Sequence, residues 1–206
     1  MILARPRSRC ARTAVALAAA LLVSAYSACS TSDARDSIVE SNGPGPILEA
    51  NPHGWSYTTE TGSVFTDGLE TLTLTEDATA TIDAVELVEA EGLELIGAKI
   101  APPPRPLSST ALVKRWPPVQ KGSFDEKTLV DAVGATFGMP DRHHPMGWEL
   151  LLGIRVVGEG HLHREGVRVR YHIGDKNYVV TIPAELAICT DKSFEERGMC
   201  PFDVSD

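Results

Sequence analysis

The sequence of 206 residues lacks most of the short motifs that mark enzymes. It contains no Gly-x-Ser-x-Gly nucleophile elbow, no glycine-rich phosphate loop and no His-Glu-x-x-His zinc-protease helix. Only four residues are cysteine, and no two of them have the Cys-x-x-Cys spacing of redox motifs. These absences argue against catalysis, and we expect a protein that is not an enzyme and has no catalytic residues.

The first 28 residues contain no acidic residue, and they carry four arginines ahead of an apolar run from Ala14 to Val23. This pattern predicts a secretory signal. The apolar run is too short to be a transmembrane helix, which needs about 20 apolar residues. The sequence therefore directs the rest of the chain out of the cytoplasm.

The signal ends in Ser27-Ala28-Cys29, which resembles the end of a bacterial lipobox. In a lipobox the cysteine receives a diacylglycerol and becomes the mature N-terminus, so Cys29 is the candidate lipid acceptor. Tyr26 stands where an aliphatic residue is usual, and ordinary cleavage without lipidation is the alternative. Residues 29–54 begin with a run rich in Ser, Asp, Gly and Pro and predict a flexible tether.

Removal of residues 1–28 takes away four basic residues and no acidic one, which leaves 15 Lys and Arg against 28 Asp and Glu. The mature chain then has a formal charge of −13, so nucleic acid is not expected as a partner. Cys189 and Cys200 are the two cysteines left in the folded part. In an exported protein they predict a disulfide, because this region offers no further ligands at zinc spacing.

The clearest strand pattern runs from residue 149 to 190. A first strand at 149–157 alternates with period two, and a second at 167–173 does the same. Turn-forming residues 174–177 and a third strand at 178–182 complete a β-hairpin. The apolar face of the first strand is expected to consist of Leu150, Leu152, Ile154 and Val156.

Three earlier strands are predicted within residues 69–100, and the irregular alternation of the second predicts a bulge near Ala84. Together these patterns predict an all-β protein with one Ig-like antiparallel β-sandwich of about seven strands, covering residues 55–206. At most one short helix is expected near 124–134, and the apolar run 129–137 could instead be a strand. The proline-rich segment 101–122 is expected to cross between sheets, with Trp116 capping the core, or alternatively to form a recognition strip.

Histidine and methionine suggest an alternative, a copper or other metal site in an extracytoplasmic domain. The candidate ligands are His143, His144 and Met146 before the central strand, and His161 and His163, expected in a loop after it. A strand of nine residues is about 25–30 Å long, so the two groups are expected at opposite ends, and no metal or cofactor is predicted. The numerous acidic residues, Asp67 and Glu70 among them, are expected on solvated outer faces.

The signal ending in Ser-Ala-Cys, the strand run DGLETLTLTEDATATIDAVELVEAEGLELIGA and the hairpin GVRVRYHIGDKNYVVTIP resemble secreted actinobacterial lipoproteins that carry an Ig-like sandwich. This resemblance implies an extracytoplasmic domain, lipid-anchored to the outer face of the cell membrane, and no catalytic residues. We therefore expect a binding or structural module whose partners are the membrane, through its lipid, and an envelope protein or ligand. A secreted form without the lipid is the alternative.

Overall fold

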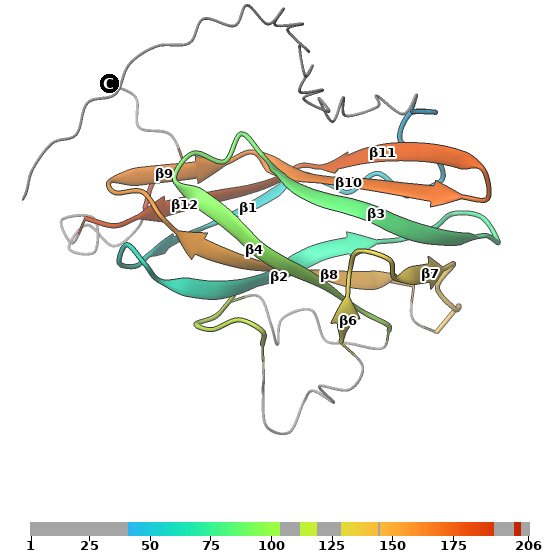
Figure 1. Ribbon diagram of the computed structural model, residues 1–206, viewed down its shortest axis with the longest axis horizontal. Helices are drawn as coiled ribbons and strands as arrows, with labels where there is room; N and C mark the ends of the chain where they lie inside the picture. Colours follow the sequence, from blue (N-terminus) through green and yellow to red (C-terminus); the bar gives the residue numbers. More distant parts are fainter. Residues whose placement is uncertain (1–40, 104–111, 119–128, 144, 192–199, 203–206) are drawn as a thin grey trace, which may run out of the picture. The chain divides into compact units, whose positions relative to one another are not determined.

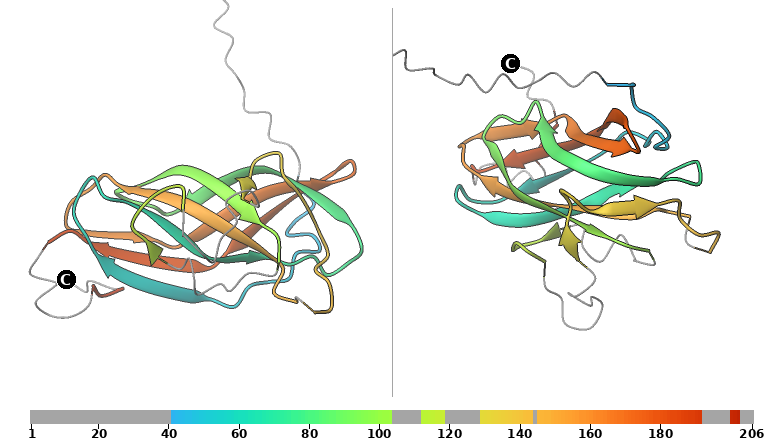
Figure 2. Two further views of the ribbon diagram at one scale, coloured as in Figure 1. Left: turned by 90° about the horizontal axis from the view of Figure 1, so that it is seen from below. Right: turned by 45° about the vertical axis from the view of Figure 1, so that its right-hand side comes forward.

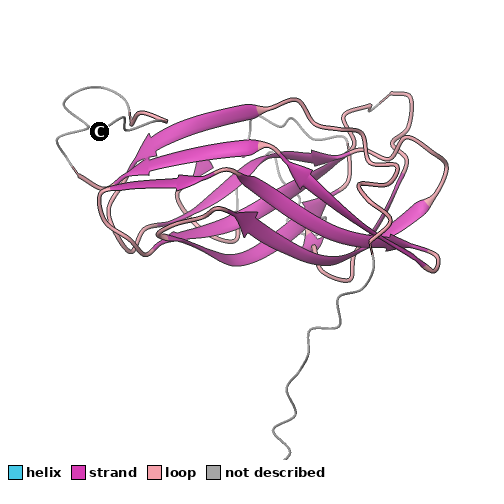
Figure 3. Ribbon diagram, turned by 90° about the horizontal axis from the view of Figure 1, so that it is seen from above, coloured by secondary structure: helices cyan, strands magenta, loops and turns pink. Residues whose placement is uncertain are grey.

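The computed structural model describes residues 41–103, 112–118, 129–143, 145–191 and 200–202. Every regular element in these ranges is a β-strand, which confirms the predicted all-β class (Figure 3). No helix of membrane-spanning length and apolarity is found among them. The strands are β1 (His53–Thr58), β2 (Val64–Leu72), β3 (Thr79–Val88), β4 (Leu93–Ala101), β5 (Leu112–Val113), β6 (Val130–Asp131), β7 (Thr136–Gly138), β8 (Trp148–Val156), β9 (His161–Arg164), β10 (Gly166–Ile173), β11 (Lys176–Ile182) and β12 (Ala184–Cys189).

The strands form three sheets that pack as a β-sandwich (Figures 1 and 2). One layer is a five-stranded sheet in the order β5-β2-β8-β4-β6. The opposite layer contains a four-stranded sheet, β11-β10-β3-β7, and a three-stranded sheet, β1-β12-β9. The pairing of β1 with β12 is parallel, and the other strand pairings are antiparallel. The described residues thus contain twelve strands where the sequence predicts about seven, because several are only two to four residues long.

Strand β8 lies at the centre of the five-stranded sheet, between β2 and β4. Its predicted apolar face is confirmed, since Leu150, Leu152, Ile154 and Val156 are all buried in the main core. The opposite face is also covered, because Leu151 is fully buried as well. Burial on both faces explains why this strand is an almost continuous apolar run.

The predicted hairpin is confirmed as β10 and β11, and β10 also pairs with β3. The register between β3 and β10 shifts at Arg170/Tyr171, opposite Asp83, which places a β-bulge where the sequence predicts one, next to Ala84. Arg170 and His172 lie on the outer face of β10 and pair with Glu86 and Asp83 of β3. Local alternation was therefore sufficient to predict both the hairpin and its exposed face.

The proline-rich segment does not cross between sheets in its described part, so that expectation is wrong. Residues Leu112 and Val113 pair with β2 at one edge of the five-stranded sheet, while Val130 and Asp131 pair with β4 at the other edge. Trp116 lies over the outer face of the same sheet, against Gly97 of β4 and Gly153 of β8. Trp116 therefore covers the outer face of β8 at Gly153.

The region near residues 124–134 contains strand β6 and a turn in its described part, and residues 119–128 lie outside that part. The described residues of the run 129–137 therefore form short strands, as the alternative prediction stated. The predicted end of the tether at residue 54 is also wrong, because the fold begins earlier. The amide of Asn42 donates to the carbonyl of Asn177, and Ile47 is buried against Leu74.

We expect Gly153→Ala to destabilise the domain by about 1–3 kcal/mol, because a methyl group there would overpack the face under Trp116. A Cβ atom at Gly153 would lie 2.4 Å from the Trp116 ring. Urea unfolding measures the effect, and Gly138→Ala in β7 is the matched control, since its nearest contact would be 3.7 Å. Equal changes in the two variants would show that Trp116 does not rest on Gly153.

Candidate functional site

The domain buries a cluster of three charged residues that join the two layers of the sandwich. Arg164 of β9 donates from Nη1 to Asp67 Oδ2 at 2.7 Å and from Nη2 to Glu70 Oε1 at 3.1 Å. Its Nε and Nη2 also donate to the carbonyl oxygen of Ala184, at 3.1 and 2.9 Å. Trp55 Nε1 donates to the other Asp67 oxygen at 3.2 Å. The side chains of the three charged residues are fully buried.

A β-bulge in β2 explains how both acids reach the interior. The pairs Asp67 with Leu152 and Glu70 with Leu150 leave two residues of β2 opposite a single residue of β8. In a regular strand, residues three apart point to opposite faces. The extra residue of the bulge places the side chains of Asp67 and Glu70 on the same face. Gly68, inside this irregular stretch, is the local signal for a bulge.

The expectation that Asp67 and Glu70 lie on a solvated face is therefore wrong. Other acidic residues do follow it: Glu94 pairs with Arg155, and Glu86 with Arg170, in partly exposed ion pairs. Sequence reasoning also missed Arg164. The signal for it was the alternation in His-Leu-His-Arg, which puts Arg164 on the same face as Leu162.

Burial raises the pKa of Glu70 to about 8, with a further contribution from the neighbouring Asp67 carboxylate. Glu70 is thus mostly protonated at pH 7. Arg164 and Asp67 then balance each other in charge. The cluster is neutral, hydrogen bonded and closed to solvent, and it connects the two layers of the sandwich.

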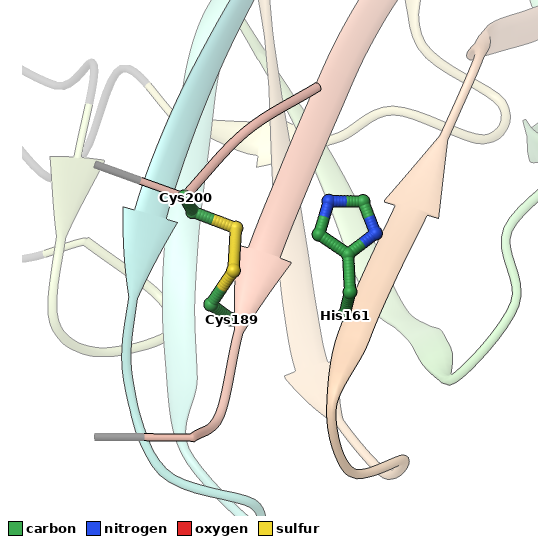
Figure 4. Close-up of side chains that lie close together, drawn as sticks. All are labelled: His161, Cys189 and Cys200. Carbon is green, nitrogen blue, oxygen red and sulfur yellow. A yellow bond between two sulfur atoms is a disulfide. The ribbon is translucent and has the colours of Figure 1, made fainter. Parts of the chain in front are cut away.

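The predicted disulfide between Cys189 and Cys200 is confirmed, with the two Cα atoms 5.5 Å apart. Cys189 ends β12, so the bond holds residues 200–202 against the end of the three-stranded sheet (Figure 4). By the chain-entropy model, closing a loop of this length stabilises a domain by about 2–3 kcal/mol. Cys29, the candidate lipid acceptor, lies outside the described residues.

His161 and His163 are in strand β9, so the expectation that they lie in an exposed loop is wrong. Both are half-buried. They pair with Cys189 and Ala187 of β12, on the face of this sheet that points away from the main core. One ring nitrogen of His161 and the two disulfide sulfurs all lie within 4.8 Å of one another (Figure 4).

The second group of candidate ligands lies at the other end of β8. His143 and Met146 precede Trp148, where β8 begins. His163 forms an isolated backbone β-bridge with Glu91, which lies near the other end of β8, at Val156. The nine residues of β8 put the two ends of the strand about 26 Å apart, at ~3.3 Å per step. His144 lies outside the described residues. The fold therefore does not assemble the copper site that both groups together would have formed.

No known family model matches this chain, and no curated protein is significantly similar to it.

Proposed function

We propose that this protein is a lipoprotein of the cell envelope, anchored through Cys29, whose β-sandwich is a non-catalytic binding or structural module. The observation that carries the proposal is the Cys189–Cys200 disulfide. Structural disulfides persist in extracytoplasmic compartments, where thiols are not kept reduced. With that pair joined and Cys10 inside the predicted signal, Cys29 is the one cysteine left to accept a lipid.

The position of the fold along the chain supports an anchored module. Asn42 is hydrogen bonded to Asn177 of β11, and the 13 residues from Cys29 to Ser41 can span at most about 45 Å. Such a linker would hold the sandwich close to the outer face of the membrane. The buried cluster of Arg164, Asp67 and Glu70 is closed to solvent, which favours a role in the fold over catalysis.

We expect a palmitate analogue with a clickable group to label the protein when it is expressed in a bacterium that processes lipoproteins. Cys29→Ala should abolish the label, because the lipid is attached to that sulfur. Cys10→Ala is the matched control and should be labelled normally, since residues 1–28 are removed. Equal labelling of the Cys29→Ala variant and the unsubstituted protein would refute anchoring at this residue.

The binding role calls for a separate experiment on intact cells. A photo-crosslinking residue placed at exposed positions of the two layers, such as Arg155 on β8 and Arg170 on β10, should capture an envelope component from one face. The same capture from both faces would indicate non-specific proximity at the membrane. Absence of capture from either face would leave the structural role as the better description.

A further inference from the structure

The face of the three-stranded sheet that points away from the core brings one imidazole to the two sulfur atoms of the disulfide. His161 and Cys189 are directly opposite each other in the antiparallel pairing of β9 with β12. Directly opposed residues have Cβ atoms about 4.5–5.5 Å apart, close enough for their side chains to meet. Cys200 reaches the same place from the other direction through its bond to Cys189 (Figure 4).

From this geometry we propose that reduction of the disulfide creates a zinc site, with Cys189, Cys200 and His161 as ligands. Two thiolates and one imidazole form a ligand set that suits Zn²⁺ and leaves the fourth, tetrahedral position to water. The three ligand atoms already lie within 4.8 Å of one another. Zinc bound to two thiolates at about 2.3 Å needs their sulfurs about 3.7 Å apart, so ligation requires the sulfurs to separate only modestly.

The movement that ligation requires falls on the short C-terminal segment. Both cysteines are buried, but Cys189 is fixed in β12, whereas Cys200 belongs to the described residues 200–202, which pair with no strand. His161 Nε2 lies 2.5 Å from the carbonyl oxygen of Pro201, and this contact holds the ring beside the sulfurs. When the disulfide opens, Cys200 and Pro201 can shift together, which separates the sulfurs and frees the ring nitrogen.

The redox step needs an external dithiol reductant. The dithiol gives two electrons and two protons to the disulfide and becomes a cyclic disulfide itself, leaving Cys189 and Cys200 as thiols. Zinc binding then displaces the two thiol protons. The same end of the domain would be held by a covalent bond in the oxidised state and by a metal in the reduced state.

The test uses the full chain with Cys10→Ser and Cys29→Ser, so that only Cys189 and Cys200 can supply a thiolate. This design also makes the result independent of lipidation. The chain is reduced with a phosphine, desalted without oxygen, and titrated with Zn²⁺ against a chromophoric chelator. We expect one equivalent of zinc in the reduced form and none in the oxidised form, and Co²⁺ should give a thiolate charge-transfer band.

Single substitutions decide whether the site is the one described. Cys200→Ser should abolish stoichiometric zinc binding. His161→Gln should lower the zinc affinity by at least about tenfold, because even the loss of a residue that only hydrogen bonds to a metal ligand typically lowers the affinity by that factor. His163→Gln is the matched control, because it lies two residues away on the same face outside the group, and its affinity should stay within about twofold.

Three results would overturn the proposal. The first is a reduced chain that binds no zinc, and the second is stoichiometric binding that survives Cys200→Ser. The third is equal weakening by His161→Gln and His163→Gln, which is the pattern expected if reduction unfolds the chain and zinc binds loose thiols. Near-ultraviolet circular dichroism of the reduced chain, recorded alongside, should keep the native aromatic signal.

Discussion

Replacing Arg164 by methionine should destabilise the domain by about 3–5 kcal/mol, because it leaves the buried Asp67 carboxylate without its cation. Arg164 is fully buried and joins β9 to two acids of β2 across the sandwich. Removal of one partner lowers the free energy of unfolding by more than the intact cluster adds to it, because the remaining charge stays buried and cannot reach water. Urea unfolding measures the loss of stability, and thermal unfolding should show a fall in Tm on the order of 10 °C.

Arg170→Met is the control for this prediction. Arg170 forms an ion pair with Glu86 at 3.0 Å, but both side chains are partly exposed, so its loss should cost less than about 1 kcal/mol. A triple variant, in which Asp67, Glu70 and Arg164 are all replaced by apolar residues of similar size, should recover much of the stability. If Arg164→Met unfolds at the same urea concentration as the unsubstituted protein, the cluster is not buried in solution.

The stability of the domain should fall as the pH rises from 5 to 8, and Glu70→Gln should remove most of that fall. The pKa of Glu70 is raised to about 8 in the folded state, while in the unfolded chain it has its ordinary value of 4.5. Between these values the folded state holds a proton that the unfolded state lacks. Its stabilising contribution is therefore complete below pH 4.5 and is lost as the pH passes through about 8.

The slope from this one proton is about 1.4 kcal/mol per pH unit, which amounts to at most about 4 kcal/mol between pH 5 and 8. Urea unfolding of both proteins at several pH values gives the difference in slope. Glu94→Gln is the control, because Glu94 is exposed and paired with Arg155, and it should keep the slope of the unsubstituted protein. A parallel pH dependence of Glu70→Gln and the unsubstituted protein would mean that Glu70 is ionised in the fold.

The sequence predicted local structure well where one face of a strand is apolar. The alternation of Leu150, Leu152, Ile154 and Val156 identified β8, and turn residues located the β10–β11 hairpin. Prediction was poorer where elements are short or their neighbours are distant. Strand β9 has only four residues, too few for its alternation to distinguish His161 and His163 from loop residues. The described part of the proline-rich segment also stays on one sheet, because the pairing of β5 with β2 cannot be seen locally.

The all-β class, the main strands and the disulfide can be predicted from the sequence alone. The physical reason is that period-two alternation is a local property, and that Cys189 and Cys200 are the two cysteines outside the predicted signal and lipobox. Tertiary structure alone decided the two clusters. Arg164 meets Asp67 from 97 residues away, and it meets Glu70 as well only because a bulge in β2 puts both acids on the same face. His161 meets Cys189 only because β9 and β12 pair in one register, and a shift of one residue would move every side chain of β9 to the other face.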